Sequence, residues 1–127
     1  MYTRIAQIKG SVQYDSFQFP LIVNGVSVPD MVLDTGAFEL TFNAKVAKQL
    51  NLPVLQPVQI GGVGGQATAY TSSCRLNLGG HIYRNVPCVV DPSLSENGLF
   101  GLRFFIDQSL ALTLNPGRSL LTVFRNP

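Results

Sequence analysis

The chain has 127 residues, of which 46% are hydrophobic and 13% are charged, and its formal net charge is +2. This length predicts one domain, residues 1–127, with a single core, and the high apolar content argues against intrinsic disorder. The sequence has no cluster of Lys and Arg and no run of about 18 apolar residues, so we expect no nucleic-acid partner and no membrane-spanning helix in this segment. The N-terminus lacks the apolar core of a signal peptide, which favours a cytoplasmic location.

The chain contains two cysteines, Cys74 and Cys88, and one histidine, His81. Two cysteines do not make a disulfide framework, and one histidine does not complete a metal cluster. His81 follows two glycines in a turn, where we expect it to be solvated. The sequence therefore predicts neither a metal nor a cofactor.

Residues 12–33 predict an alternating strand that leads into a β-hairpin. Apolar and polar residues alternate roughly over residues 12–19, and apolar runs flank Asn24-Gly25, a strong signal for a short hairpin. The second arm, residues 26–33, ends at Asp34. The register of this hairpin would therefore decide the face to which the Asp34 carboxylate points.

A short strand at residues 40–42 and a helix at residues 44–50 come next. Asn43 is a typical N-cap residue, and apolar side chains fall on one face of the helix. Residues 54–60 are apolar but contain Pro57, which predicts an edge strand or an irregular one.

The segment Ile60-Gly61-Gly62-Val63-Gly64-Gly65 is too rich in glycine to pack in a core. A phosphate loop would need a Gly-Lys-Ser/Thr sequence, and a dinucleotide site would need a following helix; neither is present. We interpret the segment as the supple tip of a β-hairpin that returns through residues 66–73.

Residues 74–78 and 82–90 predict a further hairpin around residues 79–81. A three-residue loop places the apolar side chains on one face together with both cysteines. We expect these to be buried free thiols, and a disulfide between them is the alternative. The apolar set on that face is Leu76, Leu78, Ile82 and Val86.

The last third predicts a polar loop at residues 91–97 and then a core strand that passes through Gly101 into a short helix. Strands at residues 110–114 and 120–124 follow, on either side of an Asn-Pro-Gly-Arg turn. Eight or so short strands with one or two short helices predict an all-β, closed, barrel-like fold.

Asp34 is the most distinctive acid in the sequence. An apolar strand, residues 31–33, runs directly into Asp34-Thr35-Gly36-Ala37. A carboxylate at the end of a buried strand is costly unless it is hydrogen-bonded or shares a proton. Thr35 offers a hydroxyl, and Gly36 lets the backbone turn close to the acid. The pattern predicts an acid held for chemical use.

Three stretches in this order resemble the family of retropepsin-like aspartic proteases, and the single-domain bacterial and cellular members look closest. Residues 34–37 are similar to the active-site turn of that family, residues 60–65 to the tip of its flap, and residues 99–105 to the stretch before its C-terminal helix. The likeness covers about residues 19–124, whereas residues 1–11 match nothing.

The resemblance implies a role for each matched residue. Asp34 would be the catalytic aspartate, with Thr35 bonding across a two-fold axis, Gly36 offering its backbone to substrate and Ala37 completing the turn. Residues 60–65 would be the flap, with the Val63 amide reaching substrate through a water.

Two further positions follow from the resemblance. Leu99, Phe100 and Gly101 would pack behind the active-site turn. Where retroviral members carry an acid that pairs with an arginine, this chain has Phe38 and Leu102, so we expect an apolar pair to replace the ion pair.

The chain has a single Asp-Thr-Gly, so each molecule would supply half of a catalytic site. The resemblance therefore implies a homodimeric endopeptidase in which two Asp34 carboxylates share a proton and activate water. Its substrate would be an extended peptide or protein with apolar side chains. A catalytically silent module for dimerisation or peptide binding, and another small-molecule binder, remain as alternatives.

Overall fold

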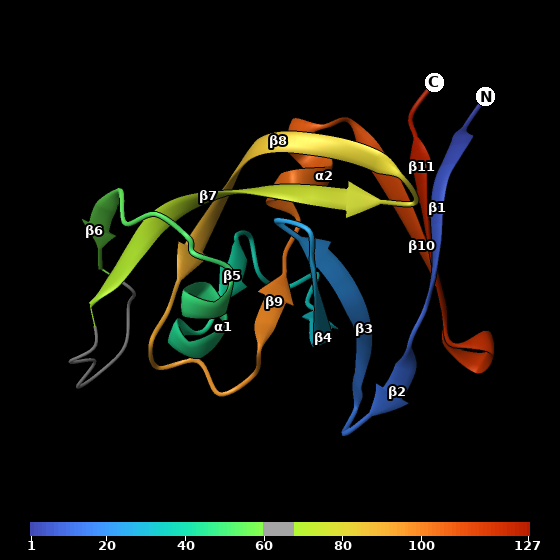
Figure 1. Cartoon of the computed structure of the whole chain (residues 1–127). Helices are drawn as coiled ribbons and strands as arrows, with labels where there is room; N and C mark the ends of the chain where they lie inside the picture. The colour runs from blue at the N-terminus through green and yellow to red at the C-terminus, as the bar shows by residue number, and fades with distance from the viewer. Residues whose placement is uncertain (60–67) are drawn as a thin grey trace.

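The computed structural model describes residues 1–59 and 68–127, and Figure 1 shows a fold built almost entirely of strands. The strands are β1 (Thr3–Lys9), β2 (Ser11–Gln13), β3 (Ser16–Val23), β4 (Val26–Leu33), β5 (Leu40–Phe42), β6 (Gln56–Val58), β7 (Ala69–Leu78), β8 (His81–Val90), β9 (Gly98–Phe100), β10 (Leu110–Asn115) and β11 (Leu120–Arg125). The helices are α1 (Ala44–Gln49), α2 (Arg103–Asp107) and the 3-10 turn η1 (Pro116–Arg118). No helix in the described part is long and apolar enough to cross a membrane.

The strands form two sheets. The larger has the order β2-β3-β4-β9-β5-β8-β7-β6, and a further pairing between β3 and β7 closes it into a ring. The smaller sheet, β1-β11-β10, stands at one side of the molecule, where both termini lie close together (Figure 1). The predicted all-β architecture with two short helices is confirmed, and β1, whose residues match nothing in the family resemblance, pairs with β11.

The β3–β4 hairpin turns at Asn24-Gly25, as predicted. Val23 pairs with Val26, and the two turn residues have φ angles of 50° and 78°, the left-handed values that a two-residue hairpin turn requires. The Asn24 side chain accepts a hydrogen bond from the Arg75 amide of β7 at 2.8 Å. Asn24 therefore both turns the hairpin and ties it to β7.

The expectation of one continuous strand over residues 12–19 is wrong. The chain reverses at Tyr14 and Asp15, whose φ angles are 51° and 63°, and Gln13 pairs with Ser16 across the turn. Neither residue is glycine, so the sequence carried no strong signal for this left-handed turn.

The predicted three-residue loop between β7 and β8 is also wrong. Leu78 pairs with His81, so the loop is Gly79-Gly80 alone, and both glycines have positive φ. A β-bulge between Cys74 and Leu76 shifts the register, which keeps most of the apolar set on the buried face. Ile82 is the exception, since 46% of it is exposed.

The core is formed by apolar side chains from both sheets and from the inner faces of α1 and α2. Phe100 lies at its centre, with ring centroids 6.0 Å from Phe19, 5.6 Å from Phe104 and 5.0 Å from Phe105. Helix α1 begins as predicted, because the Asn43 side chain accepts a hydrogen bond from the Val46 amide at 2.8 Å.

Cys74 and Cys88 are free and buried, as predicted. They lie diagonally across β7 and β8, since Cys74 pairs with Val86 and Cys88 pairs with Ser72. The neighbouring Cys88 thiol and burial together raise the pKa of the Cys74 thiol well above its ordinary value. Both sulfurs therefore behave as small apolar groups of the core.

Candidate active site

Asp34 lies at the end of β4, where three strands meet. Strand β9 is inserted between β4 and β5: it runs parallel to β4, with Leu33 opposite Phe100, and antiparallel to β5, with Leu40 opposite Phe100. The Asp34 amide donates to the Phe100 carbonyl at 3.1 Å, which extends the β4–β9 pairing into the turn. The backbone of Asp34 is thus anchored on a strand that is itself held on both sides.

The turn after Asp34 folds back on the carboxylate. The Gly36 amide donates to Asp34 Oδ1 at 3.0 Å, and the Ala37 amide donates to the Asp34 carbonyl at 3.1 Å. Asp34 is half-buried, whereas Thr35 is exposed. One carboxylate oxygen is therefore oriented by the backbone, and Oδ2 accepts no hydrogen bond from the described part of the chain. Such a group can accept or donate a proton at the surface.

Gly101 brings the segment after β9 against the back of this turn. A Cβ at Gly101 would lie 2.6 Å from the carbonyl oxygens of both Phe38 and Glu39. The next two amides close the contact: Leu102 donates to the Ala37 carbonyl at 3.1 Å, and Arg103 donates to the Phe38 carbonyl at 2.8 Å. These contacts hold Gly101 and the two residues after it against residues 37–39, and the supporting role expected for residues 99–101 stays a prediction.

The expected apolar replacement of the ion pair is wrong. Arg103 Nη1 donates to both carboxylate oxygens of Glu39, at 3.0 and 3.2 Å, so an acid and an arginine still join the turn to α2. Hydrogen bonding to Glu39 raises the pKa of Arg103. Glu39 and Arg103 each lie one residue after the two positions that were compared, Phe38 and Leu102, so that comparison missed the ion pair. The available signal in the sequence was an acid in one segment and an arginine in the other.

A pocket of about 420 Å³ opens directly beside the Asp34 turn. Its lining comes from residues 37–39 and from the five strands β5 to β9 with the residues that directly follow β6 and β8, and it combines aliphatic with polar side chains. Among the lining residues are Thr41, Val58, Val89 and Leu99. A pocket of this size could hold a small, partly apolar group beside the turn.

The predicted site residues divide into two groups. The turn at residues 34–37 and the segment at residues 99–101 are brought together. The predicted flap, residues 60–65, lies outside the described residues, so its role stays a prediction.

The family model described as "gag-polyprotein putative aspartyl protease" matches residues 19–107 of the chain. This range contains the Asp34 turn and ends with α2. None of the curated proteins compared with the chain matches it.

Several solved structures share the fold. A retropepsin-like aspartic protease from Rickettsia conorii superimposes with a TM-score of 0.66 at 17% identity, over 98% of this chain and 96% of that one. The EIAV protease complexed with the inhibitor HBY-793 gives 0.60 at 20% identity, over 76% and 91% of the two chains. The retroviral protease-like domain of Ddi1 from Leishmania major gives 0.60 at 16% identity, over 96% of each chain.

Proposed function

The chain belongs to the family of retropepsin-like, gag-polyprotein-type aspartyl proteases, and from this premise we propose that it is a homodimeric aspartic endopeptidase whose residues 1–127 act as one domain. The observation that carries the proposal is the Asp34 turn. Its carboxylate is half-exposed at the end of a buried strand, and the backbone amide of Gly36 holds Oδ1 at 3.0 Å. This arrangement supports the proposal, because peptide hydrolysis without a metal requires a positioned acid.

The catalytic centre would contain Asp34 from each of two molecules. Two carboxyl groups about 3 Å apart cannot both ionise, so the pair holds one proton, as is general for aspartic proteases. The ionised carboxylate takes a proton from water, which attacks the peptide carbonyl, while the protonated carboxyl gives its proton to the carbonyl oxygen. The first carboxyl then gives the proton it took from water to the peptide nitrogen, the second takes a proton back from a diol hydroxyl, and the C–N bond breaks to leave a carboxylic acid and an amine.

The neighbouring residues would position this centre. Thr35, which is exposed, would hydrogen-bond to the turn of the second copy, and Gly36 and Ala37 would present backbone groups to an extended substrate. Residues 60–65 would close over the substrate as a flap, with the Val63 amide reaching it through a water.

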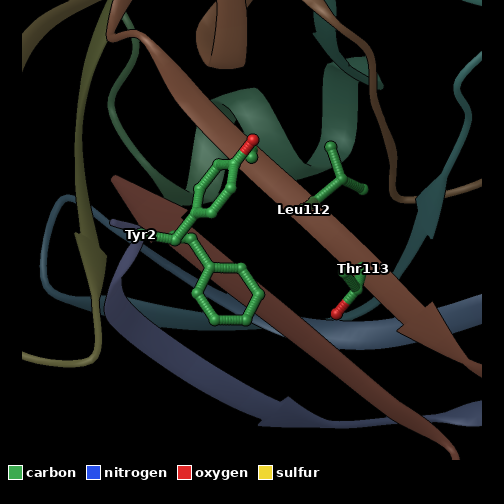
Figure 2. Close-up of a pocket in the computed structure, with 5 residues that line it drawn as sticks. Tyr2, Leu112 and Thr113 are labelled. Atoms are coloured by element: carbon green, nitrogen blue, oxygen red, sulfur yellow. The ribbon is translucent and has the colours of Figure 1, made fainter. Parts of the chain in front are cut away.

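We further propose that β10 forms the contact between the two copies. It is an edge strand of the smaller sheet, and its sequence, LALTLN, has no charge and no proline. The opposite edge, β1, carries Arg4 and Lys9 and has a β-bulge, which are features that protect an edge from pairing. An apolar pocket of about 410 Å³ lies on the same sheet, around Tyr2, Leu112 and Thr113 (Figure 2).

The catalytic proposal is tested with Asp34→Asn and a matched control, Asp30→Asn, which makes the same change at an exposed position of β4. Each protein is incubated with a pool of synthetic peptides, and the products are identified by mass spectrometry. We expect Asp34→Asn to lose at least about 100-fold in cleavage rate and Asp30→Asn to match the parent. Equal cleavage by Asp34→Asn would refute the proposal.

The dimer is tested separately by sedimentation. Leu114→Lys places a charge on β10, and Gln7→Lys makes a matched change on β1. We expect only Leu114→Lys to shift the protein toward monomer and to lower cleavage at dilute concentration. A parent that dimerises or binds peptides but cleaves none from acid to neutral pH would instead be the silent module.

A further inference from the structure

The pocket beside the Asp34 turn has an aliphatic floor that the sheet register fixes. Thr41 of β5 pairs with Val89 of β8 on one side and with Leu99 of β9 on the other, so the three residues stand in a row across adjacent strands. Val58 of β6 adds to the lining. A bound side chain would therefore have its stem against methyl groups.

Two acids also line this pocket, and only one of them forms an ion pair with a described residue. Both oxygens of Glu39 accept from Arg103 Nη1, at 3.0 and 3.2 Å, so this carboxylate is neutralised by an ion pair. Asp91, just after β8, has no Lys, Arg or His within ion-pair distance in the described part of the chain. The pocket therefore retains one negative charge that the described residues do not balance.

The hydrogen bonds that hold the Asp91 side chain do not depend on its negative charge. Asp91 Oδ1 accepts from the Ser93 amide at 2.9 Å and from Ser93 Oγ at 2.6 Å, and both of these donors are neutral. An asparagine could make the same turn through its own oxygen. The Asp91 amide donates to the Phe42 carbonyl at 2.9 Å, which fixes the residue at the end of the sheet. The Asp91 carboxylate thus lies at the pocket with neutral donors and without a cationic partner among the described residues.

We propose that Asp91 is a specificity-determining residue, and that this pocket selects a substrate side chain with an aliphatic stem and a cationic end, as in lysine or arginine. The stem would lie against Thr41, Val89 and Leu99, and the cation would pair with Asp91. This inference rests on the proposed protease function. It adds to the expected extended, apolar substrate the requirement of one basic residue near the cleaved bond.

The test measures cleavage of a synthetic peptide library by the parent, by Asp91→Asn and by Glu96→Gln. Glu96→Gln is the matched control, because it removes one charge from an exposed side chain in the same loop. The assay is run at about pH 6, well above the pH of about 4 at which ordinary carboxyl groups titrate. The best substrate is then remade with norleucine in place of its basic residue, which removes the ammonium and keeps the stem.

We expect lysine or arginine to be enriched at one position beside the cleaved bond. The kcat/KM of the lysine peptide should exceed that of the norleucine peptide about fivefold, the upper end for a partly exposed ion pair. Asp91→Asn should bring this ratio to one or below, whereas Glu96→Gln should leave it unchanged. In the parent, 1 M salt should lower the ratio, because it screens charges over a few ångströms.

The outcomes separate this inference from the proposed function. Cleavage that depends on Asp34 but shows no basic preference, or a preference that survives in Asp91→Asn, overturns the inference alone. A parent that cleaves no peptide at any pH overturns the proposed function and the inference with it.

Discussion

Replacing Gly101 by alanine should disturb the Asp34 turn from behind. The new Cβ would lie 2.6 Å from two carbonyl oxygens, those of Phe38 and Glu39, and 2.7 Å from the Phe38 carbonyl carbon, whereas ordinary van der Waals contact begins at 3.4 Å. All three atoms belong to the backbone, so no side chain can rotate away. The Leu102 and Arg103 amides also hydrogen-bond to this segment, at 3.1 and 2.8 Å, so relief of the clash must stretch those bonds.

We expect Gly101→Ala to lower the free energy of unfolding by about 1–3 kcal/mol, the usual cost of overpacking, and to reduce kcat because the turn shifts. Gly117→Ala is the matched control, since its Cβ would meet only the Asn115 side chain at an ordinary 3.7 Å. It should change stability by no more than about 1 kcal/mol. Urea denaturation measures the first effect, and peptide cleavage by the folded protein measures the second. A Gly101→Ala protein that matches the parent in both would refute the reasoning.

Three further predictions concern the core and the helix cap. Phe100→Ala should cost about 3–5 kcal/mol in denaturant unfolding, because it empties the centre of an aromatic cluster; an unchanged midpoint would contradict this. Asn43→Ala should lower the free energy of unfolding by about 1 kcal/mol, because the Val46 amide loses its acceptor. A thermal melt measures this, and an unchanged melting temperature would contradict it. Cys74 and Cys88 should react with a thiol reagent only after unfolding, and rapid labelling of the native protein would show that they are accessible.

The hairpin that leads to Asp34 could be predicted because its turn carries a strong local signal. Asn24-Gly25 has a turn chemistry that few other pairs share, and it set the hairpin that ends at Asp34. The place of Gly101 was expected only from the family resemblance, and the structure adds that a Cβ there would meet the backbone of Phe38 and Glu39.

The incorrect predictions have a common physical origin. Each concerned a feature that is determined by contacts between distant residues or that has only a weak local signal in the sequence. The turn at Tyr14 and Asp15 is held by strand pairing rather than by glycine. The β7–β8 loop was misjudged because the bulge near Cys74, which corrects the register, has no signature in the sequence. The ion pair of Glu39 with Arg103 joins residues far apart in the chain, and only the folded packing of α2 on the turn brings them within 3.0 Å.

The insertion of β9 between β4 and β5 has a consequence for the order of assembly. Strands β4 and β5 are neighbours in the sequence, but β9, which pairs with both, comes much later in the chain. Met31 of β4 pairs with Gly98, and Leu40 of β5 pairs with Phe100. Closing such a long loop is slow, and it must precede any fixed arrangement of the acid. A ribosome-bound chain that has emerged only as far as β8 would therefore lack the Phe100 carbonyl to which the Asp34 amide donates, so the backbone of the Asp34 turn could be fixed only after β9 is made.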